Sequence, residues 1–181
     1  MSRGIVLIGF MGAGKTTIGK LLADQTGLPF TDLDEYIEQK EGCSVSEIFA
    51  SHGENYFRVL ETEALQEIAR DSAAHVLACG GGTPLREENR RIMRRIGMVI
   101  WLQVEPATVS VRLKDDTTRP LLVGPDPEKK ISGLLSERED RYRAACDIEL
   151  PADHLTPEKA TEIIRILMDN ERERENPGAS V

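Results

Sequence analysis

Positive charge is in deficit in this chain of 181 residues: 23 Lys and Arg stand against 31 Asp and Glu, which gives a formal net charge of −8. A protein that binds nucleic acid through a general basic field is therefore disfavoured. Cysteine is scarce as well. The three cysteines are far apart and form no Cys-x-x-Cys pair, so neither a disulfide scaffold nor a zinc ribbon is expected. A reducing, cytoplasmic compartment fits this cysteine usage best.

Long hydrophobic runs are missing. The early apolar run over residues 5–11 is interrupted by Gly9 and is far shorter than the ~18 residues that a membrane span requires. We therefore expect a soluble protein without a membrane partner. Only 4% of the residues are aromatic, but 40% are hydrophobic, which suffices for one compact domain with a core. We expect a single domain over residues 1–170 and a disordered tail over 171–181, where apolar residues are almost absent.

Short apolar runs alternate with amphipathic segments along the whole chain. Buried strands are predicted over 4–8, 75–79 and 98–104, and weaker strands over 29–31 and 147–150. Helical spacing predicts helices over 15–25, 32–38, 44–51, 54–70, 87–95, 128–143 and 157–170. The alternation indicates an α/β fold of three layers, α-β-α, with a doubly wound parallel sheet. Ligands of such folds bind beyond the carboxyl ends of the strands.

A phosphate-binding motif lies between the first predicted strand and the first predicted helix. Residues 9–16, Gly-Phe-Met-Gly-Ala-Gly-Lys-Thr, match G-x-x-x-x-G-K-[ST]. Its glycines let successive N–H groups point inward at a helix N-terminus, where an oligophosphate fits. Lys15 supplies charge to the β- and γ-phosphates, and the Thr16 hydroxyl can ligate Mg²⁺. A glycine-rich turn with a surface lysine is the weaker interpretation, so we predict a nucleoside triphosphate site made by Gly12, Ala13, Gly14, Lys15, Thr16 and Thr17.

Two features of other nucleotide-binding classes are not found. The sequence has no Asn-Lys-x-Asp segment of the kind that reads the base in GTPases. A motor or transporter ATPase usually has a larger chain and an apolar strand that ends in Asp, whereas the strand over 75–79 ends in Gly80-Gly-Gly82. Main-chain N–H groups of glycine can approach a ligand closely because no Cβ intervenes. This favours a small transferase over a switch, although a flexible turn would also explain the glycines.

Candidates for the acceptor side are acidic and arginine residues. Asp32 and Asp34 follow the second strand; one can support Mg²⁺ through water while the other accepts a hydrogen bond from an acceptor hydroxyl, but both can also be helix-capping acids. The guanidinium groups of Arg58 and Arg138 can each grip a carboxylate or phosphate, and a surface ion pair is the alternative for Arg138. Arg119 lies in a turn-rich loop over 114–126, which we expect to act as a lid over the nucleotide.

Taken together, these motifs resemble the shikimate kinase family. The resemblance covers roughly residues 4–168 and rests on an ordered set of motifs: the phosphate motif at 9–16, Asp32-x-Asp34, Phe57-Arg58-x-x-Glu61, Gly80-Gly-Gly82, Thr118-Arg119-Pro-Leu-Leu122 and Arg138-x-x-x-Tyr142-Arg143. It implies ATP-dependent phosphorylation of the 3-hydroxyl of shikimate, giving shikimate 3-phosphate and ADP, by a P-loop kinase with a nucleoside monophosphate kinase-like fold that acts as a monomer.

The resemblance also implies a role for each site residue. Lys15 would hold phosphates, and Thr16 would ligate Mg²⁺ with Asp32 in the outer coordination shell. Asp34 would bind the acceptor hydroxyls and is the candidate base. The carboxylate of shikimate would be held by a clamp of Arg58 and Arg138 beside Gly80, Gly81 and Gly82, with Glu61 orienting Arg58 and Arg119 acting from the lid.

Some assignments stay open at this point. Arg112 is a candidate for stacking on the adenine base, and an ordinary helix surface explains it equally well. Phe49 and Phe57 can form an apolar wall of the pocket or simply helical core. Two other classes compete with the main prediction: another small-molecule P-loop kinase, such as a gluconate kinase or a nucleoside monophosphate kinase, and a non-catalytic nucleotide-binding switch. The identity of the phosphoryl acceptor discriminates among them.

Overall fold

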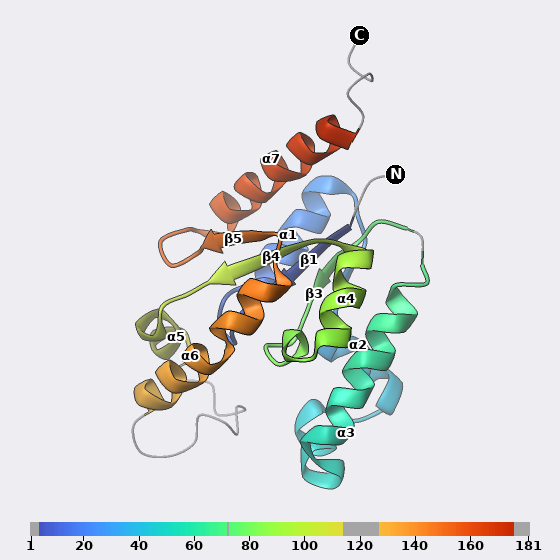
Figure 1. Ribbon diagram of the computed structural model, residues 1–181, viewed down its shortest axis with the longest axis vertical. Coiled ribbons are helices and arrows are strands. Elements are labelled where there is room, and N and C mark those ends of the chain that lie inside the picture. Colours follow the sequence, from blue (N-terminus) through green and yellow to red (C-terminus); the bar gives the residue numbers. More distant parts are fainter. Residues whose placement is uncertain (1–3, 72, 114–126, 176–181) are drawn as a thin grey trace.

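A computed structural model describes residues 4–71, 73–113 and 127–175 and has three layers, with one sheet between two layers of helices (Figure 1). The sheet has five strands in the order β2-β3-β1-β4-β5, and all neighbouring strands are parallel. The strands are β1 (Gly4–Ile8), β2 (Phe30–Asp32), β3 (Val76–Ala78), β4 (Gly97–Gln103) and β5 (Ile148–Pro151). The predicted doubly wound parallel sheet is confirmed.

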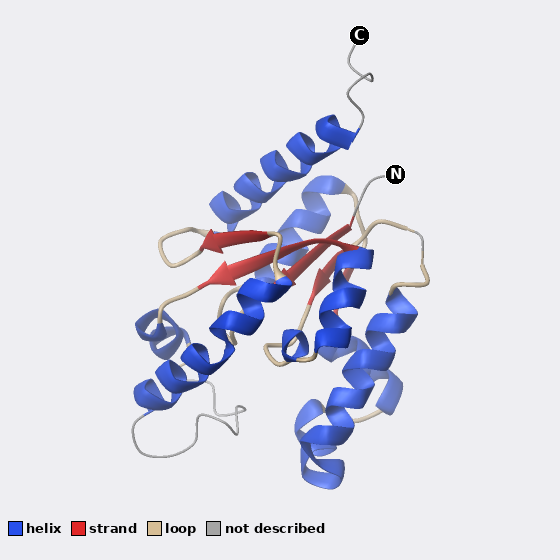
Figure 2. Ribbon diagram, in the orientation of Figure 1, coloured by secondary structure: helices blue, strands red, loops and turns tan. Residues whose placement is uncertain are grey.

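Helices connect the strands and lie on both sides of the sheet, as Figure 2 shows. They are α1 (Lys15–Thr26), α2 (Leu33–Glu41), α3 (Val45–Ile68), the 3-10 turn η1 (Thr83–Leu85), α4 (Glu87–Ile96), α5 (Pro106–Arg112), α6 (Pro127–Ala145) and α7 (Pro157–Glu175). Their ends follow local sequence rules: Ser44 and Glu47 form a capping box at the start of α3. None of the helices in the described ranges is long and apolar enough to span a bilayer.

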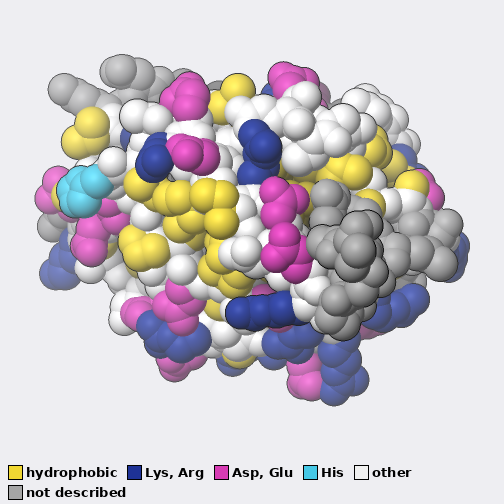
Figure 3. All heavy atoms as spheres, turned by 90° about the horizontal axis from the view of Figure 1, so that it is seen from above, with side chains coloured by type: hydrophobic (Ala, Val, Ile, Leu, Met, Phe, Trp, Pro, Cys, Tyr) yellow, Lys and Arg dark blue, Asp and Glu magenta, His cyan; other side chains and the backbone are white. Residues whose placement is uncertain are grey.

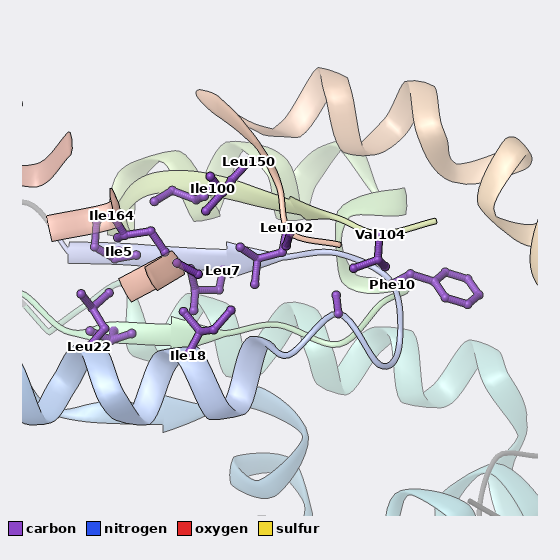
Figure 4. Close-up of a cluster of buried hydrophobic side chains, with 14 of the residues drawn as sticks. Ile5, Leu7, Phe10, Ile18, Leu22, Ile100, Leu102, Val104, Leu150 and Ile164 are labelled. Carbon is purple, nitrogen blue, oxygen red and sulfur yellow. The ribbon is translucent and has the colours of Figure 1, made fainter. Parts of the chain in front are cut away.

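The core has two parts, one on each face of the sheet. Alternate residues of β1 face opposite sides, so Ile5 and Leu7 belong to one cluster while Val6 and Ile8 belong to the other. Side chains of α1 and α7 complete the first cluster (Figure 4), and those of α2, α3 and α4 complete the second. Because both faces are covered, β1 is buried throughout. Its carboxyl end is thereby held rigidly where the phosphate motif begins.

Two elements differ from the sequence prediction. Helix α5 was not expected, because it has only seven residues, although Pro106 at its first turn is a favourable start. Helix α7 extends to Glu175, so the prediction of a disordered tail is wrong for residues 171–175. Glu and Arg are good helix formers, which allows the helix to continue into this charged segment. Residues 176–181 and the predicted lid over 114–126 lie outside the described residues.

The surface mixes charges of both signs. On the face shown in Figure 3, acidic and basic side chains are interspersed, with hydrophobic side chains exposed between them.

Candidate functional site

The carboxyl ends of three neighbouring strands bring the predicted site residues to one edge of the sheet. Strand β1 leads into the phosphate motif, β2 ends at Asp32, and β3 leads into the three glycines. A cavity of about 830 Å³ opens at this edge. Its lining includes thirteen of the predicted residues: Gly12, Gly14, Lys15, Thr16, Thr17, Asp32, Asp34, Arg58, Glu61, Gly80, Gly81, Gly82 and Arg138.

The phosphate motif folds into a loop that requires glycine. Gly9, Gly12 and Gly14 have φ of 146°, 75° and 92°, a region that side-chain-bearing residues rarely adopt. A Cβ at Gly9 would also lie 2.6 Å from the main-chain oxygen of Leu102. Lys15 Nζ donates to the main-chain oxygens of Gly9 and Phe10 at 3.0 and 2.9 Å, so its ammonium group lies over the loop. Phosphate oxygens bound in the loop would meet this positive charge together with the N-terminus of α1.

Ala13, within the loop, and Arg112, beside it, are not among the residues that line the cavity. The side chain of Ala13 is buried in the core, so only its main chain is available to a phosphate. Arg112, at the end of α5, donates from Nη1 to the main-chain oxygen of Gly12 at 2.9 Å. This contact places its guanidinium group against the phosphate loop, and stacking on the adenine base stays a prediction. Arg119 lies outside the described residues.

Asp32 contacts both the phosphate loop and the start of α2. Its Oδ2 accepts a hydrogen bond of 2.7 Å from the Thr16 hydroxyl, and its Oδ1 accepts one of 3.1 Å from the main-chain N–H of Asp34. It is therefore the N-cap of α2 and also the partner of the residue predicted to ligate Mg²⁺. The cap fixes the carboxylate, so the phosphate loop and α2 are joined at this point.

Arg58 is held by two carboxylates of its own helix. Its Nη1 donates to Glu61 Oε2 and its Nη2 to Glu54 Oε1, both at 2.7 Å. Glu61 is fully buried, whereas the side chain of Arg58 is 12% exposed. Burial acts to lower the pKa of Arg58, but the charges and hydrogen bonds of Glu61 and Glu54 outweigh it, so the pKa is raised above its ordinary value. The guanidinium group therefore stays charged at the cavity wall.

The three glycines make room for these side chains. A Cβ at Gly82 would lie 2.2 Å from Nη1 of Arg58, and a Cβ at Gly80 would lie 2.8 Å from Oδ1 of Asp34. Gly81 has no such close neighbour, since its nearest atom would be 3.5 Å away. Gly80 and Gly82 thus allow a carboxylate and a guanidinium group to lie flat against the main chain.

Helix α6 supplies the second arginine. Arg138 lines the cavity, and its guanidinium carbon lies 5.6 Å from the centre of the Phe10 ring. One helical turn further, the hydroxyl of the buried Tyr142 donates to the main-chain oxygen of Gly81 at 2.7 Å. Burial raises the pKa of Tyr142, so its hydroxyl remains a donor. This hydrogen bond fixes α6, and with it Arg138, against the glycine segment.

Two aromatic side chains of α3 form an apolar part of the cavity lining. Gly53, with φ of 80° and ψ of 172°, breaks the helical geometry within α3. The break lets Phe49 and Phe57 meet with ring centres 5.0 Å apart, and both line the cavity. Phe57 is also buried in the core, so the two interpretations of these residues hold together.

Several residues that build the site were not found from the sequence. Thr62, Thr83 and Asn89 are buried polar residues behind Arg58 and Glu61. Ser44 and Ser46, at the start of α3, line the cavity. Apart from the helix-capping position of Ser44, no motif marked these residues, and a buried threonine or asparagine is recognisable only when its partners, distant in the sequence, are known. The sequence offered one local signal for Thr83: it stands before a proline, directly after the three glycines.

Comparison with known proteins adds the family. A model of the shikimate kinase family matches residues 11–168. The chain belongs to the shikimate kinase family. The shikimate kinase of Alkaliphilus oremlandii is 46% identical over 174 residues, which cover 94% of this chain and 99% of the relative. Further relatives named shikimate kinase, such as that of Sulfurihydrogenibium sp., are 42% identical over 162 residues, 90% of this chain and 95% of theirs.

Solved structures agree with the family assignment. The shikimate kinase of Acinetobacter baumannii in complex with shikimate superposes with a TM-score of 0.87 at 35% identity, covering 93% of this chain and 94% of that one. The shikimate kinase of Aquifex aeolicus superposes with a TM-score of 0.80 at 34% identity, covering 94% and 98%. The P-loop kinase fold expected from the resemblance is thereby confirmed, and this member of the family is an enzyme.

Proposed function

We propose that this kinase transfers the γ-phosphoryl group of ATP to the 3-hydroxyl of shikimate, giving shikimate 3-phosphate and ADP. The observation that carries the proposal is that Arg58, Arg138 and Asp34 line the same cavity as the phosphate loop. Shikimate has one carboxylate and vicinal hydroxyls, which two guanidinium groups and one carboxylate can bind together. A neutral sugar would offer no carboxylate for the two guanidinium groups to bind.

On the nucleotide side, catalysis consists of positioning and charge stabilisation. Main-chain N–H groups from Gly12 to Thr17 would hold the phosphates, and Lys15 would leave the main-chain oxygens of Gly9 and Phe10 to contact the β- and γ-phosphates. Arg112 lies close enough to the loop to contact the nucleotide. The role of Arg119 and of the lid over 114–126 remains a prediction from the sequence.

The residues around Thr16 fit a magnesium ion shared with phosphates. Thr16 and Asp32 offer only oxygen donors, the type that Mg²⁺ prefers, and their oxygens are 2.7 Å apart. No group of three or more acidic, cysteine or histidine side chains that could hold a metal occurs within the described ranges. The protein would thus contribute Thr16 directly and Asp32 through water, with phosphate oxygens completing the sphere. When bound, the ion would neutralise negative charge on the phosphates.

On the acceptor side, Arg58 and Arg138 would clamp the carboxylate, so that the 3-hydroxyl faces the phosphate loop. Asp34, whose carboxylate is seated against Gly80, would accept a hydrogen bond from that hydroxyl and orient it. In a loose transition state the acceptor hydroxyl loses its proton late, so the larger contribution of Asp34 would be to position this hydroxyl. Asp34 would then accept the proton as the hydroxyl releases it.

An acceptor panel tests the proposal. ADP release is measured with ATP, Mg²⁺ and either shikimate, gluconate or a nucleoside monophosphate. Turnover with shikimate alone is expected, and NMR of the product should place the phosphate on the 3-oxygen. Turnover with gluconate or a nucleoside monophosphate only would assign a different kinase activity, and ATP binding with no acceptor-dependent turnover would indicate a switch.

We further propose that the enzyme acts as a cytoplasmic monomer, which light scattering and cell fractionation would test.

A further inference from the structure

Most of the buried polar side chains gather behind the arginine clamp. Six polar or charged residues in the described part of the chain are buried, and four of them, Glu61, Thr62, Thr83 and Asn89, form one hydrogen-bonded group. Buried polar groups are costly unless they are satisfied, so such a group is kept only where each member has partners. Of the four, only Glu61 lines the cavity.

Glu61 is bound on both of its oxygens. Oε2 accepts from Nη1 of Arg58 at 2.7 Å, and Oε1 accepts from the hydroxyl of Thr83 at 2.5 Å. With no exposed surface, this carboxylate depends on protein donors in place of water. Thr83 therefore determines which way the Glu61 carboxylate is turned, and Glu61 in turn determines where Nη1 of Arg58 lies.

Asn89 and Thr62 fix Thr83 relative to helix α3. Nδ2 of Asn89 donates to the main-chain oxygen of Thr83 at 3.0 Å, and Oδ1 of Asn89 accepts from the Thr62 hydroxyl at 2.8 Å. The main-chain oxygen of Arg58 in turn accepts from Nη1 of Arg86 at 3.0 Å and lies 3.1 Å from the Thr62 hydroxyl. The segment after the glycines, the start of α4 and the middle of α3 are thus joined around the clamp.

We propose that Thr83 is a positioning residue for the acceptor acid: its hydroxyl holds Glu61, and Glu61 holds Arg58 in the pose that meets the carboxylate. This inference rests on the proposed function, because it assumes that Arg58 binds the acceptor. Thr83 acts only through Glu61, since it lines no part of the cavity. The nucleotide end shares none of these hydrogen bonds, so losing the hydroxyl must affect the acceptor and leave ATP binding intact.

The test compares variants at Thr83 in steady-state kinetics with both substrates. Thr83→Val keeps the side-chain shape and removes the hydroxyl; it should raise KM for shikimate about tenfold, with KM for ATP changed less than about twofold. Thr83→Ser keeps the hydroxyl and should restore KM for shikimate to within about twofold of the wild-type value. Thr161→Val is the matched control, because Thr161, like Thr83, is fully buried. The Thr161 hydroxyl donates to the main-chain oxygen of Pro157 in α7, away from the residues that line the cavity.

Each outcome decides the matter. The inference is overturned if Thr83→Val leaves KM for shikimate unchanged, if it raises both KM values equally, if Thr83→Ser behaves like Thr83→Val, or if Thr161→Val shows the same selective change. Should Thr83→Val not fold, the smaller Thr83→Ala takes its place with the same expected split. Wild-type enzyme without shikimate turnover would instead refute the proposed function, so the two failures are distinguishable.

Discussion

At the nucleotide end of the cavity, most of the polar contacts come from one continuous segment, residues 9–16, joined by Asp32 and by Arg112 at the end of α5. At the acceptor end they are assembled from α2, α3, the glycine segment and α6, which lie up to about a hundred residues apart. The first end relies on main-chain conformation at Gly9, Gly12 and Gly14. The second relies on buried side chains that hold one another.

Because of this difference, substitutions at the two ends should have different effects on turnover, substrate binding and stability. A loop made of main chain is exposed to ligand and carries few buried charges, so loss of a side chain there should alter turnover and spare stability. A clamp made of a largely buried guanidinium group and a fully buried carboxylate is part of the folded structure, so loss of one partner should alter both binding and stability. Four substitutions test this division.

The largest effect is expected for Arg58→Ala. It leaves the Glu61 carboxylate buried beside Thr83 without its cationic partner, and the free energy of unfolding should fall by roughly 3–5 kcal/mol. KM for shikimate should rise as well. Arg138→Ala is the matched variant: the guanidinium group of Arg138 lies over the ring of Phe10 and interacts with the hydroxyl of Tyr142, so its loss should raise KM for shikimate with a change in unfolding free energy below about 1 kcal/mol. Denaturant unfolding measures both, and equal destabilisation by the two variants would contradict the comparison.

Lys15→Met should mainly affect turnover. The ammonium group is bound by main-chain oxygens of the loop, and its removal takes positive charge from the transferring phosphoryl group. We expect kcat to fall by about 10²- to 10³-fold with KM for shikimate nearly constant. Lys159→Met, which removes an exposed lysine paired with Glu162 on α7, serves as the control. If kcat for Lys15→Met stayed at the wild-type value, Lys15 would have no place in the mechanism.

The glycine segment offers a matched pair within two neighbouring residues. In Gly82→Ala the new methyl group would meet the Arg58 guanidinium group at 2.2 Å, so the clamp must move and KM for shikimate should rise about 10- to 100-fold. Gly81→Ala would place its methyl group no closer than 3.5 Å to any atom, and KM should change less than about threefold. A larger effect at position 81 than at position 82 would show that the glycines serve the loop and not the clamp.

The same contrast explains what the sequence could predict. The phosphate loop was found because its glycines, Lys15 and Thr16 are contiguous and lie between a strand and a helix. Arg58 and Arg138 were found because arginines are unexpected in motifs of a chain with excess negative charge. Thr83 and Asn89 were not found, because their partners on α3 lie 22 and 27 residues away in the sequence and such pairing leaves no local pattern. The end of α7 was misjudged because composition indicated disorder where helix propensity prevailed.

The smallest effect concerns Cys79, which follows β3 between the two ends of the cavity and lines it. Burial, followed by the charges of Glu61 and Asp34, raises the pKa of this thiol well above 9.0. The folded protein therefore keeps the proton at a pH where the unfolded chain loses it, so the stabilisation is complete below pH 9.0 and is lost as pH rises above it. The free energy of unfolding should decline above this pH more steeply in the wild type than in Cys79→Ala, by at most about 1.4 kcal/mol per pH unit. Tyr36, Tyr56 and Tyr142 also have raised pKa values, but they are present in both proteins and so do not affect the comparison. Parallel declines of the unfolding free energy in the two proteins would mean that the Cys79 thiol ionises in the folded state and that the cavity tolerates its charge.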